Sequence, residues 1–192
     1  MSLIPAFKLG VWNAWIFMSV FLLQMLAVKF VDKGVWERSH VPLEERRTKL
    51  ERYVGIFANL IWLLALGYSV FLPLPLGTTW FYIGLSVFVA GLTLMVIATF
   101  NFITALPDQL ITKGAYNLSR HPMYVATFFI CLGSGLASAS WLFILFSVVT
   151  ALCFYQEALI EERYCLNRYG NVYKNYVKRT PRWIAIPKKY DK

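Results

Sequence analysis

Side chains capable of chemistry gather in one short stretch of this chain, between residues 114 and 124. The stretch reads Gly-Ala-Tyr-Asn-Leu-Ser-Arg-His-Pro-Met-Tyr and contains Tyr116, Arg120, His121 and Tyr124. It lies between two apolar segments, and a glycine and a proline shape its backbone. Ionisable groups that accompany membrane-crossing segments usually serve a function. The stretch therefore predicts a ligand site at a bilayer surface, with a simple interfacial anchor as the alternative for Arg120.

A second polar group follows further along the chain and consists of Glu157, Glu161 and Glu162. In a helix Glu157 and Glu161 are one turn apart and share a face, whereas Glu162 is offset by about 100°. Carboxylates at the C-terminal end of a helix oppose its dipole, so some group must compensate them. Pairing with Arg163, Arg168 and the basic tail, or solvation, would do so. The functional alternative is a cationic or hydroxyl-rich ligand.

The composition indicates which class of protein carries these groups. Of the 192 residues, 58% are hydrophobic and 15% are charged, and the mean hydropathy is +0.55. These values lie outside the range of ordinary soluble domains and indicate an integral membrane protein. The net charge of +9 is spread over several loops. Because it forms no single basic stripe with aromatic platforms, nucleic acid is not expected as a partner.

Cysteine and histidine usage gives no sign of a disulfide framework or a metal site. Cys131 and Cys153 fall within apolar segments and Cys165 lies on the cytosolic side of the predicted topology, so all three are expected to be free thiols. The chain has two histidines, His40 and His121, and they belong to no cluster of ligands. No metal is expected to bind.

Five apolar segments approach the length of about 20 residues that a helix needs to cross the hydrocarbon core. They cover residues 11–31, 53–72, 79–100, 123–137 and 141–155. The last two are short and separated only by Ser-Ala-Ser, which predicts a tight helical hairpin. The expected fold is all-α, a polytopic membrane bundle of about five transmembrane helices with a cytosolic C-terminal helix.

The distribution of Lys and Arg predicts the orientation of this bundle. With five spans, the loops 32–52 and 101–122 and the C-terminal tail share one side, and they hold every Lys and Arg except Lys8 and Lys29. Because basic residues favour the cytosolic side, we expect the N-terminus outside and the C-terminus in the cytosol. A four-span alternative, in which the short pair forms a re-entrant hairpin, leaves the polar loops on the same side.

The segments outside the spans also carry helical signals. The mixed charges of residues 32–52 predict a solvated interfacial helix. After residue 155 the chain stays helical in pattern but becomes polar, and Gly170 is expected to end or bend that helix. Tyr169, Tyr173 and Tyr176 then form one aromatic face, which we expect to pack against the protein or to lie in the headgroup layer.

The order and spacing of several motifs together resemble the superfamily of isoprenylcysteine carboxyl methyltransferases and phospholipid methyltransferases. The resemblance covers about residues 100–187 and rests on Gly114-x-Tyr116, Arg120-His121-Pro122-x-Tyr124, Glu161-Glu162, Tyr169-Gly170-x-x-Tyr173-x-x-Tyr176 and Pro181-Arg182. It implies S-adenosylmethionine as cofactor and a lipid-like or prenylated acceptor that enters from the membrane. Within one domain, residues 1–192, it implies N-terminal spans over 1–100 and a cofactor-binding catalytic core over 101–187.

The resemblance also implies roles for individual residues. Glu157 and Arg182 are expected in the catalytic part of the site, and the cofactor pocket would be lined by Gly114, Tyr116, Arg120, His121, Pro122, Tyr124, Glu161 and Glu162. A carboxylate can accept both hydroxyls of the cofactor's ribose, and a cation can hold its carboxylate. Methyl transfer is an in-line displacement that needs little proton transfer, so positioning is expected to supply most of the rate.

Two positions depart from the family pattern. An arginine is common four residues before the glutamate pair, where this chain has Glu157. A glycine is common two residues after the tyrosine of the His-Pro motif, where this chain has Ala126. An arginine could hold an anionic acceptor and a glutamate cannot, so Glu157 is expected to face the acceptor and to favour a neutral or amine nucleophile.

Two other functions fit parts of the sequence. Membrane reductases that reduce isoprenoid or sterol double bonds with NADPH share a similar Arg-His-Pro-x-Tyr segment, but they usually have Asn at the position of Met123 and more spans. A non-enzymatic scaffold or small transporter would account for the hydrophobicity, but not for the joint spacing of the His-Pro and Glu-Glu motifs. Transport also calls for ionisable groups near mid-membrane, and the first four spans have none in their centres.

Overall fold

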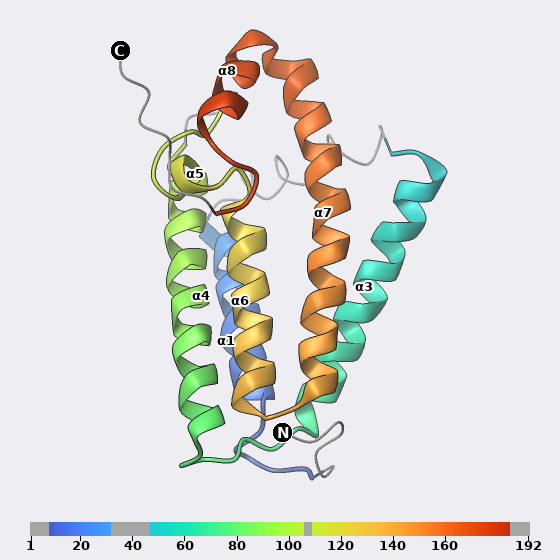
Figure 1. Cartoon of the computed structure of the whole chain (residues 1–192), viewed down its shortest axis with the longest axis vertical. Coiled ribbons are helices and arrows are strands. Elements are labelled where there is room, and N and C mark those ends of the chain that lie inside the picture. Colours follow the sequence, from blue (N-terminus) through green and yellow to red (C-terminus); the bar gives the residue numbers. More distant parts are fainter. Residues whose placement is uncertain (1–7, 32–46, 106–108, 185–192) are drawn as a thin grey trace.

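The computed structural model describes residues 8–31, 47–105 and 109–184, and their regular structure is helical apart from one isolated bridge between Asn13 and Pro73. The all-α prediction is thereby confirmed for this part of the chain. The helices stand side by side in an upright bundle, with α5 and α8 together at one end (Figure 1). Their bounds are α1 (Trp15–Val31), α3 (Lys49–Val70), α4 (Thr79–Ile103), α5 (Ala115–Leu118), α6 (Pro122–Ala137), α7 (Trp141–Tyr169) and α8 (Asn171–Arg179).

Each apolar segment of the sequence corresponds to one helix of the bundle. By length and composition α3, α4 and α7 are suited to cross a membrane, whereas α6 and the apolar part of α1 are shorter. A helix of 16 residues, such as α6, reaches only about 24 Å, against about 30 Å for the hydrocarbon core. The protein is therefore an integral membrane protein built around three long helices, and the count of five spans stays a prediction.

Caps specified by the sequence begin these helices. Thr48 and Glu51 form a reciprocal capping box at the start of α3, with Glu51 N donating to Thr48 Oγ1 at 3.3 Å and Thr48 N donating to Glu51 Oε2 at 2.8 Å. Residues 32–46 of the predicted interfacial helix lie outside the described residues. The remaining charged positions, from Lys49 to Arg52, form the first turn of α3 itself, because the capping box extends that helix beyond its apolar part.

The last long helix, α7, runs without a break from the apolar hairpin to the polar C-terminal region. It has 29 residues, about 43 Å, so it is longer than the hydrocarbon core is thick. Gly170, with φ of 52°, ends it and starts α8 at once. The prediction that Gly170 interrupts the helix is confirmed, and α7 carries the glutamates to the end of the bundle where α5 and α8 lie (Figure 1).

Backbone contact joins α4 to α6. A Cβ placed on Gly84 would come within 2.1 Å of the Ala137 backbone nitrogen, and one on Gly133 within 2.4 Å of the Phe88 nitrogen. Small residues allow membrane helices to approach this closely. The same pair encloses the core, where Phe88 stacks on Phe17 of α1 with ring centroids 4.3 Å apart. α4 and α6 thus form the scaffold whose ends carry the loop from residue 109 to His121.

The cysteines behave as the sequence predicts. Cys131 and Cys153 are buried within α6 and α7, Cys165 is partly exposed, and all three are free thiols. In such places cysteine acts as a small hydrophobic residue.

Candidate functional site

The loop that enters the candidate site starts at a glycine that no other residue could easily replace. Gly114 has φ of 62° and ψ of −129°, a conformation that L side chains rarely adopt, and a Cβ there would meet Asn101 Oδ1 at 2.1 Å. That oxygen accepts a hydrogen bond from Ala115 N at 2.9 Å. Asn101 near the end of α4 therefore positions the start of α5 and, with it, Tyr116.

α8 packs its aromatic face onto this loop. Tyr173 and Tyr176 are buried, and Tyr176 Oη donates a hydrogen bond to the Tyr116 carbonyl at 2.5 Å. The prediction that the tyrosine stripe packs against the protein is confirmed for these two residues. Burial, with the nearby charge of Glu161 as a smaller cause, raises the pKa of Tyr116, so its hydroxyl stays protonated.

The backbone carbonyls of Pro181 and Arg182 accept hydrogen bonds from Ser119 and Arg120, just before His121. Arg120 N donates to the Pro181 carbonyl at 2.9 Å. Ser119 Oγ donates to the Arg182 carbonyl at 2.9 Å, and the same oxygen accepts a hydrogen bond from His121 N at 3.1 Å. Two motifs that are far apart in the sequence thus form one structural unit through the buried Ser119, which sequence reasoning did not single out.

Glu162 lies at the centre of the charged cluster. Arg182 donates from Nε and Nη2 to its two oxygens at 2.8 Å each, which is the bidentate geometry that arginine favours. Arg120 Nη2 lies 3.2 Å from Glu162 Oε1, and His121 Nε2 lies at the same distance from that oxygen. The Glu162 carboxylate therefore connects α7 with the His-Pro motif and with the segment after α8.

His121 lies between the two glutamates. Its Nδ1 is 3.1 Å from Glu161 Oε2 and its Nε2 is 3.2 Å from Glu162 Oε1. Both ring nitrogens can donate only in the charged imidazolium. Burial is the largest single influence and lowers the pKa of His121, but the hydrogen bonds and charges of the two glutamates together raise it above its usual value. The site thus favours a protonated histidine.

Tyr124 completes the cluster from the first turn of α6. Its hydroxyl donates to Glu161 Oε1, and its ring stacks between His121 and Phe154, with centroids at 5.6 and 4.6 Å. The Glu161 side chain is 30% exposed, against 13% for Glu162. Glu161 is therefore the carboxylate of the pair that a ligand can reach.

Aromatic rings line the outer part of the cluster. The guanidinium of Arg182 lies over the Tyr155 ring, 5.2 Å from its centroid, and the Trp183 ring is 6.1 Å from that of His121. The hydrogen bonds that Arg182 donates to Glu162 are the first cause of a raised pKa at Arg182, and the negative charge of Glu162 adds to it, so Arg182 stays positively charged. Neither Tyr155 nor Trp183 was predicted, because single aromatic residues near a membrane surface are too common to be informative.

Glu157 lies apart from this cluster and pairs with Arg47, just before α3. Arg47 Nη2 donates to Glu157 Oε2 at 2.6 Å. Arg163, which the sequence suggested as a partner for the glutamates, instead donates to Glu51 of α3 at 2.7 Å. The predicted pairing with the basic tail is confirmed for Arg182, which binds Glu162, whereas Glu157 is compensated by Arg47.

The structure brings together most of the predicted site. Direct contacts join His121 and Tyr124 with the glutamate pair, and Arg120 and Arg182 with Glu162. Pro122 is the first residue of α6, and Gly114 and Tyr116 lie just before the motif, at the start of α5. Glu157 shares its helix face with Glu161 but binds Arg47 instead. Sequence reasoning did not predict a role for Asn101, Ser119 or Arg47. The one feature of the sequence that points to them is that each is a polar residue near the end of an apolar segment.

Comparison with known proteins shows which family the chain belongs to. The sequence profile of the phospholipid methyltransferase family matches residues 74–172, which include α4, α6 and the site residues from Gly114 to Glu162. The matched segment begins ahead of α4, a span for which the sequence alone had shown only hydrophobicity, and it ends before Pro181.

A curated relative points the same way. The protein-S-isoprenylcysteine O-methyltransferase of Schizosaccharomyces pombe is 35% identical over 78 residues, which are 40% of this chain and 33% of the relative. The match thus spans a third of that relative's length. The family profile covers more than half of the chain, and the chain belongs to the phospholipid methyltransferase family.

Proposed function

We propose that this protein transfers a methyl group from S-adenosylmethionine to a lipophilic acceptor in the membrane. The observation that supports it most is the cluster of Tyr124, His121 and Glu161 within the family-matched segment, at one end of a membrane bundle. A prenylcysteine-type carboxylate and a phospholipid or amine are the acceptor classes that the two matched names suggest.

The residues present fit the cofactor. Glu161 offers a partly exposed carboxylate, which can accept from the ribose hydroxyls or pair with the amino group. Arg120 has a buried Nε without a hydrogen-bond partner among the described residues. A buried donor of this kind is costly to leave unpaired, so Arg120 is the group that we assign to the cofactor carboxylate. We assign Gly114, Tyr116 and Pro122 to the wall of the cofactor pocket.

The chain's own residues supply position and exclusion of water. The cofactor contributes an electrophilic methyl group on a cationic sulfur. Glu161 and Glu162 hold His121 and Tyr124 in fixed orientations, and the stacked rings of Tyr124 and Phe154 cover the apolar side of the site. Alignment of two reactants can supply about 7–11 kcal/mol of a barrier, so a site of this kind needs no acid–base triad.

The distribution of basic residues supports a cytosolic site. α5 and α8 lie at the same end of the bundle (Figure 1). Lys113 precedes α5, Arg120 follows it, and α8 carries further basic residues in its last turn. Because basic residues favour the cytosolic side, we place this end in the cytosol and the α6–α7 hairpin on the opposite side. The N-terminus then lies outside.

Binding of S-adenosylhomocysteine, measured by calorimetry or thermal shift in detergent, tests the proposal. The wild-type protein should bind this product and be stabilised by it, whereas NADPH should have no effect. A reductase would show the reverse pattern, and a scaffold would respond to neither compound. No response to S-adenosylhomocysteine from a folded sample contradicts the proposal.

Two variants locate the binding site. His121→Ala and Glu161→Ala should each weaken S-adenosylhomocysteine binding by more than about tenfold, since the loss of two charge-assisted hydrogen bonds is worth about 2–3 kcal/mol. The other histidine of the chain, His40, lies outside the described residues, and His40→Ala is the control that should leave binding unchanged. Equal effects of all three substitutions would refute the assignment.

A further inference from the structure

Arg47 is a cation whose position the cofactor site does not explain. It precedes α3, and its Nη2 bonds Glu157 Oε2 at 2.6 Å, although the two residues are 110 positions apart in the chain. Both side chains are largely buried, with 19% and 15% exposed. The Nε of Arg47 is also buried and has no hydrogen-bond partner in the described structure. A guanidinium has five donors, so this one retains capacity for a further acceptor.

The backbone of α3 is adapted to this arginine. Gly55 is buried, and a Cβ placed on it would lie 2.5 Å from Arg47 Nη1 and 3.6 Å from Glu157 Oε1. Any other residue at position 55 would displace the guanidinium. The absence of a side chain thus leaves room for Arg47 between α3 and α7.

A purely structural role for the pair is insufficient as an explanation. A second ion pair, between Glu51 of α3 and Arg163 of α7, joins the same two helices at 2.7 Å. That pair is on the surface, where it costs little desolvation. A buried pair with an unpaired donor is a less favourable way to connect helices. The buried position of Arg47 therefore calls for a second function.

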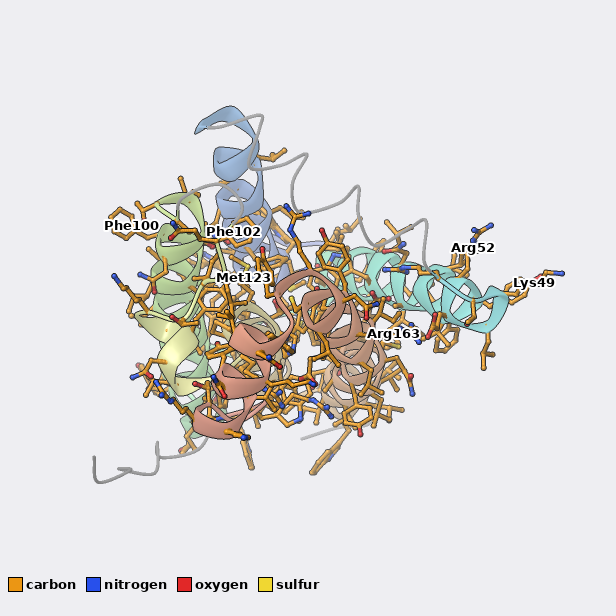
Figure 2. The ribbon with its side chains drawn as sticks, turned by 90° about the horizontal axis from the view of Figure 1, so that it is seen from above. Lys49, Arg52, Phe100, Phe102, Met123 and Arg163 are labelled. Carbon is orange, nitrogen blue, oxygen red and sulfur yellow. The ribbon has the colours of Figure 1, made fainter. Side chains whose placement is uncertain are left out.

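Arg47 is close to the proposed cofactor site. Glu157 is one helical turn before Glu161, and the Tyr124 hydroxyl, which donates to Glu161, is within electrostatic range of both Glu157 and Arg47. Seen from the end of the bundle, Lys49 and Arg52 lie at the outer tip of α3, far from Met123 next to the His-Pro motif (Figure 2). Arg47 differs from these neighbours because it folds back toward α7.

We infer that Arg47 is the residue that binds an anionic oxygen of the methyl acceptor, and that Glu157 holds it in place before the acceptor arrives. The inference rests on the proposed methyl transfer and adds a specificity-determining residue to it. A carboxylate or a phosphate could both use the open donors of the guanidinium, because arginine presents its donors in a planar fork. The acceptor is thus a lipid that carries a negative charge near its reacting group.

Glu157 has a different role here from the one expected from the sequence. Alone, a glutamate would repel an anionic acceptor. Paired with Arg47, it carries no uncompensated charge and acts as a positioning residue. The two interpretations predict opposite effects of Glu157→Gln on an anionic acceptor.

Steady-state methylation with labelled cofactor distinguishes these two interpretations of Glu157. The acceptors are N-acetyl-S-farnesylcysteine, which carries a carboxylate, phosphatidylethanolamine vesicles, which carry a phosphate, and farnesylthiol, which is neutral. The variants are Arg47→Gln, Arg47→Lys, Glu157→Gln and, as a matched control that removes the other α3–α7 ion pair, Arg163→Gln. Binding of S-adenosylhomocysteine and thermal unfolding are measured for each.

Arg47→Gln should raise the KM for the anionic acceptor by about tenfold or more, the scale of a lost charge-assisted hydrogen bond, and leave S-adenosylhomocysteine binding unchanged. Arg47→Lys should recover part of the loss, and Arg163→Gln should have no effect on KM. Glu157→Gln should also raise the KM for that acceptor, by less than Arg47→Gln does, because Arg47 is then no longer held in place by its partner. The acceptor with the arginine-dependent KM identifies carboxylate or phosphate as the bound group.

Several outcomes would overturn the inference while the proposed function stands. They are an equal change of KM in Arg47→Gln and Arg163→Gln, methylation of farnesylthiol alone, or an unchanged or lowered KM for an anionic acceptor in Glu157→Gln. A wild-type protein that binds no S-adenosylhomocysteine and methylates no acceptor would instead contradict the proposed function itself.

Discussion

Two helix interfaces meet the candidate site, and they are built in opposite ways. α4 and α6 approach until the backbone at Gly84 and Gly133 touches the facing helix. α3 and α7 are joined at their polar ends by ion pairs, Arg47 with Glu157 and Glu51 with Arg163. At the α3–α7 interface, the absence of a side chain at Gly55 leaves room for the guanidinium of Arg47.

This difference in contacts makes the α4–α6 interface the rigid one and the α3–α7 interface the adaptable one. Backbone contacts between α4 and α6 leave no atom that can move aside, so this pair holds the loop to His121 in one geometry. Side chains between α3 and α7 can change rotamer and partner. The family match includes α4, α6 and all of α7 and begins after α3. A family-wide cofactor site on the rigid pair, and acceptor selection at α3, would fit this division.

The largest effect is expected at the rigid interface. Gly84→Ala places a Cβ 2.1 Å from the Ala137 backbone nitrogen, so the helices must separate, and we expect a loss of about 3 kcal/mol in the free energy of unfolding. Gly55→Ala meets side-chain atoms of Arg47 and Glu157 and should cost far less. Gly67→Ala meets no atom within 4 Å and should be neutral or slightly stabilising, because alanine favours the helix more than glycine does. Thermal unfolding in one detergent ranks the three. If Gly84→Ala were as mild as Gly67→Ala, the contrast between the interfaces would be lost.

An intermediate effect is expected at the charged cluster. Glu162→Ala removes the shared partner of Arg120, His121 and Arg182, and we expect a loss of about 2 kcal/mol, because donors that are largely buried lose their acceptor. Arg163→Ala removes an exposed ion pair and should cost less than about 0.5 kcal/mol. Chemical unfolding, with the indole fluorescence as signal, compares the two. Similar losses would show that Glu162 is not the centre of the cluster.

The smallest effect is a dependence of stability on pH. The folded protein raises the pKa of His121, so the stabilisation from its charged form is fully present below the unfolded pKa of about 6.5 and is lost as pH rises through the folded value. Wild-type protein should therefore lose stability relative to His121→Gln as the pH rises across this window. The difference between the two unfolding curves isolates this group from the others that titrate. A difference that grows with pH would contradict the assignment.

Sequence reasoning predicted the elements because they depend on local patterns. Apolar runs of sufficient length specify helices in a membrane, where every backbone group must be hydrogen-bonded within the protein. Gly170 ended its helix as expected, and the tyrosines of α8 are buried on one face. The predicted interfacial helix, residues 32–52, extended too far along the chain. Thr48 and Glu51 form the capping box of α3, so Lys49 to Arg52 belong to the first turn of α3.

The composition and spacing of the site motifs were also sufficient to identify the family, because a histidine, a tyrosine and two glutamates at those intervals are rare together. They could not show what each group contacts. Ser119 and Arg182 are 63 residues apart, and Arg47 and Glu157 are 110 apart. Such partners meet only when helices pack in one particular order and register, and that is a property of the whole chain. Hydropathy and spacing thus establish a membrane methyltransferase family, while the packing of α3 on α7 decides that an arginine accompanies Glu157.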